Sequence, residues 1–192
     1  LQGDWSSDVC SSDLLILMKK LEQKIDYQFK DISLLKLALT HRSVGKNNNE
    51  RLEFLGDSIL GLVISRELYK RFTHVDEGKL SRLRSHLVRG QTLAQLASTL
   101  DLSNILILGS GELKSGGFRR ESIQADVVEA IFGAVFLDSD FDTVNTVILK
   151  LYKERLDIIN PNDSLKDFKT QLQEYLQKRG NALPKYELIK TV

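Results

Sequence analysis

Apolar residues recur at helical spacing along most of the chain, and this pattern predicts an all-α fold from Leu21 to about Asp157. The longest predicted helix covers Glu50 to Phe72, where apolar side chains occupy positions 52, 55, 59, 62 and 63. Further helices are expected over residues 32–40, 77–89, 91–100, 122–137 and 143–157. Gly90 separates the second and third of these. Runs of β-branched residues with a period of two are absent from this region, so the pattern does not favour a sheet.

Two segments rich in turn-forming residues interrupt the helical pattern. The sequence GSGELKSGG at residues 109–117 predicts a flexible loop. Residues 159–165 contain Asn-Pro-Asn-Asp and are predicted to be a linker, because proline and the Asx residues stop the preceding helix. Helical spacing returns over residues 164–179, and residues 186–192 are expected to form one β-strand. Since one helix and one strand cannot bury a core, residues 166–192 are predicted either to be a truncated module or to dock on another surface.

The first 17 residues differ from the rest of the chain. They contain the near-repeat WSSDV and CSSDL, together with the only tryptophan and the only cysteine, Cys10. This stretch resembles translated adapter sequence, so we expect residues 1–17 to be a non-native leader and Met18 to be the natural start. A single cysteine excludes an intrachain disulfide. No apolar run approaches the roughly 18 residues of a membrane span, so no membrane partner is expected.

Charge is unevenly distributed along the chain, although the net charge is only +1. Between Arg66 and Arg89, seven Lys or Arg residues stand against three acids. Such a basic strip favours a polyphosphate substrate, because clustered positive charge attracts phosphate groups. A solvated helix face would give the same pattern, so charge alone does not decide between the two interpretations.

Two pairs of acids lie at helical spacing among apolar residues. Glu53 and Asp57 are four residues apart in NNNERLEFLGDSIL, and Asp126 and Glu129 are three residues apart in ADVVEA. Burying several ionised carboxylates without a compensating charge is costly, so the pattern favours a bound divalent metal. Oxygen ligands select hard cations such as Mg²⁺ or Mn²⁺. Two such cations can activate a water molecule and stabilise the leaving oxygen of a phosphodiester.

Other interpretations of these acids are open at this point. None of the three histidines stands in a Glu-x-x-His pattern with them, which argues against a carboxylate-bridged di-iron bundle. The acids could instead lie on helix surfaces and pair with Arg51, Arg82 or Arg84. Spacing alone does not distinguish this arrangement from a metal site.

Several segments resemble the motifs of the ribonuclease III family, in particular its short bacterial members. The resemblance runs from Met18 to the C-terminus and is carried by LTHRS (39–43), NERLEFLGDSIL (49–60), VDEGKLSRLRSHLV (75–88), GELKSGGFRRESIQADVVEAIFGAVFLD (111–138) and LQEYLQ (172–177). It implies an all-α ribonuclease III endonuclease domain, a dimeric helical bundle, over residues 18–158. Residues 166–192 resemble the first helix and first strand of an α/β double-stranded-RNA-binding domain, whose remaining elements the sequence lacks.

The resemblance also implies roles for individual acids. Glu53, Asp57, Asp126 and Glu129 match the metal-binding and catalytic acids of the family. Among these, Asp57 and Glu129 are the two tied most directly to catalysis. Two further family acids, implicated in the cleavage site and its RNA contacts rather than as principal ligands, are matched by Glu50 and Glu77.

Further matches concern the dimer, the fold and contacts with RNA. Phe54 matches an aromatic residue that inserts into the partner subunit, although a core phenylalanine is the alternative. His41 belongs to the Thr-His-Arg segment, where we expect a structural histidine. In the loop KSGGFRR, cations that could meet phosphates or cap neighbouring acids are Lys114, Arg119 and Arg120. On the C-terminal helix, the face that such domains set against the RNA minor groove carries Thr170, Gln173 and Glu174.

These observations predict a cytoplasmic homodimer that cleaves double-stranded RNA by Mg²⁺-dependent phosphodiester hydrolysis, with Mn²⁺ as a substitute. The resemblance implies products with 5′-phosphate and 3′-hydroxyl ends, and a role in rRNA and mRNA processing. Two alternatives differ in class from this prediction. One is a non-catalytic relative that binds double-stranded RNA, and the other is a metal-dependent hydrolase of small phosphate substrates such as nucleotides.

Overall fold

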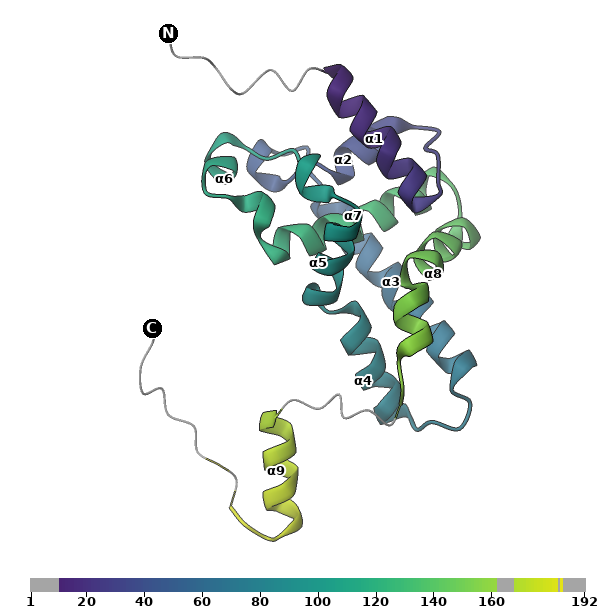
Figure 1. The fold of residues 1–192 in the computed structure, drawn as a ribbon, viewed down its shortest axis with the longest axis vertical. Helices are drawn as coiled ribbons and strands as arrows, with labels where there is room; N and C mark the ends of the chain where they lie inside the picture. The colour runs from purple at the N-terminus through teal and green to yellow at the C-terminus, as the bar shows by residue number, and fades with distance from the viewer. Residues whose placement is uncertain (1–10, 162–167, 183, 185–192) are drawn as a thin grey trace.

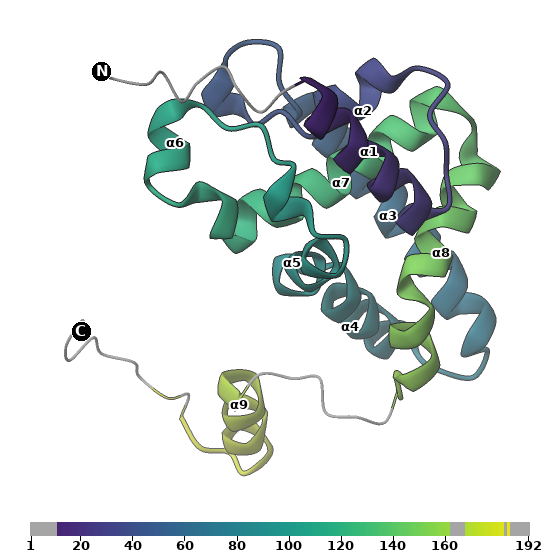
Figure 2. The same ribbon diagram turned by 45° about the horizontal axis from the view of Figure 1, so that its top comes forward.

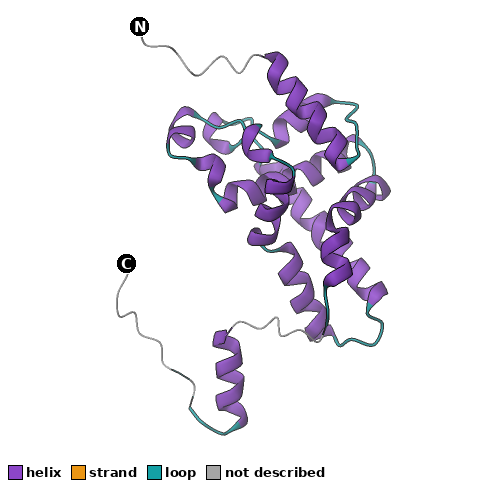
Figure 3. Ribbon diagram, in the orientation of Figure 1, coloured by secondary structure: helices purple, strands orange, loops and turns teal. Residues whose placement is uncertain are grey.

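The computed structural model describes residues 11–161, 168–182 and 184 of the chain. Figures 1 and 3 show helices joined by loops, and the regular elements that these residues form are all helical. Pairing of extended backbone is limited there to one isolated parallel bridge between Thr40 and Ile107. The predicted all-α fold is therefore confirmed for the described residues. None of the helices in them has the length and apolar character that a membrane span needs.

The helices predicted over residues 32–40, 50–72, 77–89, 91–100, 122–137 and 143–157 are all present within about two residues of their expected ends. The structure adds the α-helices Ser11–Ile25 and Ser110–Lys114 and three short 3-10 helices. The first part of the chain forms α1 (Ser11–Ile25), α2 (Ile32–Ala38), η1 (Arg42–Val44) and α3 (Glu50–Arg71). The central part forms α4 (Glu77–Val88), α5 (Gly90–Thr99), η2 (Leu102–Asn104), α6 (Ser110–Lys114) and η3 (Gly117–Arg119). The last part forms α7 (Glu121–Asp138), α8 (Phe141–Ile158) and α9 (Phe168–Lys178).

Aspartate side chains fix the first turns of three helices. Asp31 caps α2, Asp76 caps α4 and Asp140 caps α8, because each carboxylate accepts a hydrogen bond from a backbone N–H in the first turn. These bonds satisfy N–H groups that have no partner within the helix. The caps therefore set the starts of these helices, while their buried apolar faces give the helical periodicity.

Two boundary predictions were wrong. Gly90 is the first residue of α5 rather than the break before it, because the carbonyl of extended Arg89 accepts the first hydrogen bonds of that helix. The glycine-rich segment 109–117 is not an irregular loop, since most of it forms α6 and the start of η3. The strand predicted over residues 186–192 lies outside the described residues.

The first helix includes part of the segment that composition assigned to a leader. α1 begins at Ser11, and within it Leu14 and Leu17 pack against the hydrophobic core. Met18 is almost fully buried in the same helix. The non-native origin of residues 1–17 stays a prediction.

Polar contacts fasten the C-terminal end of α1 and the turn after it to three other parts of the fold. We call this set the α1 anchor, and it consists of the pairs Lys24–Asp101, Asp26–Lys150 and Tyr27–Asp138. The first two are ion pairs with N–O distances of 2.6 Å, and in the third the Tyr27 hydroxyl donates to Asp138. They tie the segment to the α5–η2 turn, to α8 and to the end of α7.

Helices α3 and α7 cross at the centre of the molecule, with α5 and α8 packed around them (Figures 1 and 2). Their backbones touch at two glycines. A Cβ atom on Gly56 would overlap the carbonyl oxygen of Glu129, and one on Gly133 would overlap the carbonyl oxygen of Leu52. Glycine is therefore required at both positions for this close approach. The contact fixes where side chains of α3 stand relative to those of α7.

Candidate metal centre

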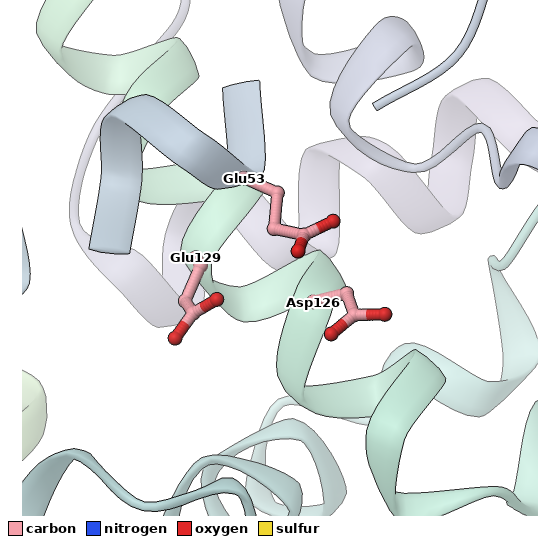
Figure 4. Close-up of side chains that lie close together, drawn as sticks. All are labelled: Glu53, Asp126 and Glu129. Atoms are coloured by element: carbon pink, nitrogen blue, oxygen red, sulfur yellow. The ribbon is translucent and has the colours of Figure 1, made fainter. Parts of the chain in front are cut away.

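Three acids come together where α3 and α7 cross. Glu53 lies in the first turn of α3, and Asp126 and Glu129 lie one turn apart in α7. Figure 4 shows Glu53 extending from α3 toward the two acids of α7. One carboxylate oxygen of each residue lies within 4.8 Å of those of the other two, and all three side chains are half-buried. We call these residues the acidic triad.

A buried asparagine holds the start of α3 in place. Asn49 is 2% exposed, and its side-chain amide donates to the carbonyl of Ala38. Its backbone N–H donates to the carbonyl of Thr40, and its own carbonyl accepts from the N–H of Glu53. Asn49 thereby links the first turn of α3 to the end of α2. Sequence analysis missed this role because a buried amide gives no periodic signal.

The electrostatic environment of Glu129 is unfavourable to its charged form. Burial is the largest cause, and the negative charges of Asp57, Glu53 and Asp126 act in the same direction. Together they raise the pKa of Glu129 to about 8. A cation held between these carboxylates would reverse the effect, because it favours ionised ligands.

The other two triad acids are affected in the same direction. Burial raises the pKa of Glu53, and the charges of Asp126 and Glu50 raise it further. Burial also raises the pKa of Asp126. The positive charge of Arg42 opposes this effect at both carboxylates but does not cancel it.

The triad forms no ion pair with a Lys, Arg or His side chain within the described ranges. The alternative in which arginines pair with these acids is therefore wrong for the residues proposed. Arg84 instead donates to the hydroxyl of Ser65 at 3.3 Å. Three convergent carboxylates that form no ion pair with a cation of the described residues fit a hard divalent cation, which prefers oxygen ligands. The triad could bind such a metal.

Asp57, the fourth predicted ligand, lies beside the triad rather than within it. Its side chain is exposed one turn after Glu53 on α3. It does not belong to the group whose oxygens lie within 4.8 Å of one another. Its charge nevertheless raises the pKa of Glu129, so it contributes to the same negative field. The structure thus brings together three of the four predicted ligands, with Asp57 at the edge.

The two supporting acids have partners of their own. Glu50 is the first residue of α3, and its carboxylate lies 3.6 Å from the guanidinium of Arg42. Glu77 is the first residue of α4 and accepts a hydrogen bond of 2.7 Å from the hydroxyl of Ser81. Neither carboxylate is part of the triad group.

Phe54 and His41 differ in burial: the first is exposed and the second is buried. Phe54 is 78% exposed, so the interpretation as a core phenylalanine is wrong. His41 is buried and caps η1, with its Nδ1 atom 2.9 Å from the hydroxyl oxygen of Ser43. The expectation of a structural histidine is confirmed by this contact.

One cation of the KSGGFRR segment caps a neighbouring acid, and the contact of the others with phosphate stays a prediction. Arg120 forms an ion pair of 2.8 Å with Glu112, which is the acid-capping arrangement. The guanidinium of Arg119 stacks over the ring of Phe118, and Lys114 is exposed at the end of α6.

The predicted RNA-facing residues of the C-terminal helix lie within α9. Gln173 is half-buried, whereas the side chains of Thr170 and Glu174 lie outside what the structure describes. Their role in binding RNA stays a prediction.

Comparison with known proteins gives consistent matches. A family model described as ribonuclease-III-like matches residues 31–156. Ribonuclease 3 of Aliivibrio fischeri is 60% identical over 173 residues, which cover 90% of this chain and 78% of that protein. Ribonuclease 3 of Psychromonas ingrahamii is 60% identical over 172 residues, which cover 90% of this chain and 75% of that protein.

A solved structure agrees with these matches. The nuclease domain of ribonuclease III from Campylobacter jejuni superposes with a TM-score of 0.71 at 42% identity, covering 73% of this chain and 99% of that one. Its structure is described as flexible in a region involved in dimer formation. Since the family model covers well over half of the sequence, and the curated relatives are matched over about three quarters of their length, this chain belongs to the ribonuclease III family.

Proposed function

We propose that this protein is an endoribonuclease that hydrolyses double-stranded RNA, as its ribonuclease 3 relatives imply. The observation that carries the proposal is the acidic triad, formed in a member of this family at the crossing of α3 and α7. A family member that had lost catalysis would not be expected to keep unpaired acids in a half-buried position, because the repulsion between them destabilises the fold. Retention of the triad therefore favours the enzyme over a non-catalytic RNA-binding relative.

The triad acids are the proposed metal ligands, with Mg²⁺ as the natural cation and Mn²⁺ as a substitute. When bound there, the cation would neutralise charge on the scissile phosphate and lower the pKa of the attacking water. Glu129 must lose its proton before it can act as a ligand, because its pKa lies near 8 without metal. Asp57, exposed at the edge of the triad, is the acid that we expect to meet the reacting groups together with Glu129.

The proposed reaction is attack of a water oxygen on the phosphorus of an RNA phosphodiester. The bond from phosphorus to the 3′ oxygen breaks, and the 3′ oxygen takes up a proton. The products therefore carry a 5′-phosphate and a 3′-hydroxyl end. Glu50 and Glu77 are proposed to support the cleavage site, and processing of rRNA and mRNA in the cytoplasm stays a prediction.

A homodimer is the proposed active form, because two sites are needed to cut both strands. Exposed apolar side chains on one face of α3 support it: Phe54 is 78%, Leu62 56% and Tyr69 75% exposed. Their spacing of eight and seven residues places them on the same side of the helix. Phe54 is proposed to insert into the partner subunit.

The boundaries of the modules are also proposals. We assign residues 18–158 to the nuclease domain and residues 159–165 to a linker. Residues 166–192 are assigned to the first helix and first strand of a double-stranded-RNA-binding domain. The helix α9, which follows the proposed linker, supports this division.

A cleavage assay tests the proposed function. Purified protein is incubated with a long RNA duplex and Mg²⁺, and the end groups of the products are identified. We expect short duplexes from the native protein, and a loss of at least about 10³-fold in rate for Glu129→Gln, since the variant lacks a charged ligand. The matched control is Glu121→Gln, which removes an exposed acid from the first turn of the same helix and should cut normally.

Two outcomes would contradict the proposal. If the duplex stays intact with Mg²⁺ and Mn²⁺ but is bound, and a chelator does not affect binding, the protein is a non-catalytic binder. If Glu129→Gln cuts as fast as the native protein, the triad is not the catalytic centre.

A further inference from the structure

One cation lies beside the acidic triad, and no role has been assigned to it. The guanidinium of Arg42 is 3.6 Å from the carboxylate of Glu50, and 70% of its side chain is exposed. An exposed ion pair at this distance is weak and exchanges readily with solvent or another partner. Arg42 is therefore held near the triad without being committed to Glu50.

The backbone around Arg42 is fixed, in contrast to its side chain. The N–H of His41 donates to the carbonyl of Ile107 at 3.0 Å, and the hydroxyl of Ser43 accepts from the N–H of Gly109 at 2.9 Å. A Cβ atom on Gly109 would overlap the carbonyl oxygen of Ser43, so the two segments are in direct backbone contact. The residues before and after Arg42 are thus anchored, and the arginine projects from a rigid support.

The electrostatic potential around the triad is negative, because Glu50 and Asp57 lie near its three carboxylates. Among the described residues, Arg42 is the Lys or Arg side chain whose positive charge acts on Glu53 and Asp126, and His41 also lies near Asp126. His41 is buried and bonded to Ser43, so it is not available to a ligand. An RNA backbone adds a negative charge with every phosphate, and its approach to this cluster is opposed by the acids. A guanidinium suits this position because its fork of N–H donors matches phosphate oxygens.

We propose that the Arg42 guanidinium leaves Glu50 and binds a backbone phosphate of the RNA beside the acidic triad. The inference rests on the proposed function and adds a further substrate contact to it. Arg42 then compensates the charge of a phosphate next to the one that is cut. Because the contact is made to the bound substrate, it contributes to binding more than to the chemical step.

Steady-state cleavage of an RNA duplex in Mg²⁺ tests this contact. We expect Arg42→Gln to raise KM about tenfold and to leave kcat within about twofold, because a charged hydrogen bond to the substrate is lost. Arg42→Lys keeps the charge and should restore KM to within about threefold of the native value. The matched control is Lys46→Gln, which removes one positive charge from an exposed position four residues along the same loop and should change KM less than twofold.

Binding without cleavage gives a second readout. In the Glu129→Gln background, duplex affinity is measured over a range of salt concentrations. Log K falls as log salt rises, and adding Arg42→Gln should make this negative slope shallower by about one, as expected for one lost phosphate contact. A residue that only supported the fold would leave this slope unchanged. Thermal unfolding should be the same for both proteins, since the Arg42 side chain is largely exposed.

The failure of this inference is distinguishable from failure of the proposed function. If the native protein does not cut duplex RNA, the proposed function fails. If it cuts, but Arg42→Gln leaves KM and the salt slope unchanged, only the phosphate contact is overturned. A shift in the Mg²⁺ concentration needed for cleavage, with RNA affinity unchanged, would show that the charge of Arg42 tunes the metal affinity of the triad instead of binding RNA, and would also overturn the inference. If Lys46→Gln raises KM as much as Arg42→Gln does, the effect comes from net charge and the specific contact of Arg42 is overturned.

Discussion

The acids of the α1 anchor form ion pairs or hydrogen bonds, whereas the acids at the crossing of α3 and α7 lie next to other carboxylates. Burial acts to raise the pKa of Asp138, but hydrogen bonds from the Tyr27 hydroxyl and from the N–H groups of Lys30 and Asp31 bring it below its usual value. The pKa of Glu129 is raised to about 8 in the same structure, because burial and neighbouring acids act together. The two carboxyls lie on the same helix, α7.

This contrast separates acids that stabilise the fold from acids that serve a ligand. Asp138 accepts hydrogen bonds in its charged form, so its ionisation favours the folded state. The triad acids repel one another, so their ionisation opposes the folded state until a cation is bound. We infer that repulsion at the crossing is tolerated because the rest of α7 is well buried and anchored.

The largest expected effect comes from breaking the crossing itself. Gly56→Ala would place a methyl group against the carbonyl of Glu129, so the helices must separate. We expect the free energy of unfolding to fall by about 3 kcal/mol, in the range of overpacked cores, and cleavage to slow as the carboxylates move apart. Urea unfolding at a fixed protein concentration measures the first effect, and the duplex assay measures the second.

The control for this change lies on the same helix. A Cβ atom on Gly61 would meet nothing within 4 Å, so Gly61→Ala should be neutral or stabilising by up to about 1 kcal/mol. If Gly56→Ala is as stable and as active as Gly61→Ala, the backbone contact does not set the geometry of the triad.

The next effect tests the α1 anchor. Asp138→Asn removes the charge that accepts hydrogen bonds from Tyr27, Lys30 and Asp31. We expect a loss of about 2 kcal/mol in the free energy of unfolding, because hydrogen bonds to a charged group are stronger than neutral ones, while kcat stays unchanged. Chemical denaturation and the cleavage assay, run on the same sample, give both numbers. Asp142→Asn, an exposed change at the start of α8, should affect neither, and an equal loss there would show that Asp138 has no special role.

The smallest effect is a pH dependence of the metal-free protein. The pKa of Glu129 is about 8 in the folded chain against an ordinary value of 4.5, so the folded state binds this proton more tightly. Its contribution to stability is complete below about pH 4.5 and is lost as the pH rises through about 8. In EDTA we expect the free energy of unfolding to fall by about 1–2 kcal/mol over this window, a discounted value because the side chain is partly exposed.

Urea unfolding over a pH series measures this dependence. Glu129→Gln should reduce the pH dependence, since the variant has no proton to lose at this site and only Glu53 and Asp126 of the triad still contribute, and Glu121→Gln should leave it as in the native protein. Mg²⁺ should stabilise the protein more at about pH 8 than at about pH 5, because ligands must be deprotonated to bind it. A flat profile in the native protein without metal would contradict the raised pKa of Glu129.

Sequence periodicity located most of the amphipathic helices, including the short α2, but it missed α6 and the start of α1 before Leu21. The stripes of α3 and α7 bury enough apolar surface to be recognised, and the Asp caps of α2, α4 and α8 fix where those helices begin. The short helix α6 was predicted as a loop because the segment is rich in glycine. The sequence does not show that Glu112 of this helix forms an ion pair with Arg120. That contact joins residues eight positions apart and has no signature in helical spacing.

The candidate site also has parts that the sequence predicted and parts that it did not. Spacing and family motifs found Glu53, Asp126 and Glu129, which the structure brings together. The role of Asn49 and the closeness of α3 to α7 were not found, because both depend on contacts between segments distant in sequence. Such contacts become visible only when the helices are placed in space.

The contact of Gly56 and Gly133 with backbone carbonyls limits how the sequence around this site can evolve. Main-chain atoms of the two helices are in direct contact there, so they set a lower limit to the separation of the helices and hence to the spacing of the triad. Neighbouring apolar residues can drift in size, provided that the total volume is kept. The two glycines form a frame that could be transferred to another helical pair, together with a cation site, in protein design.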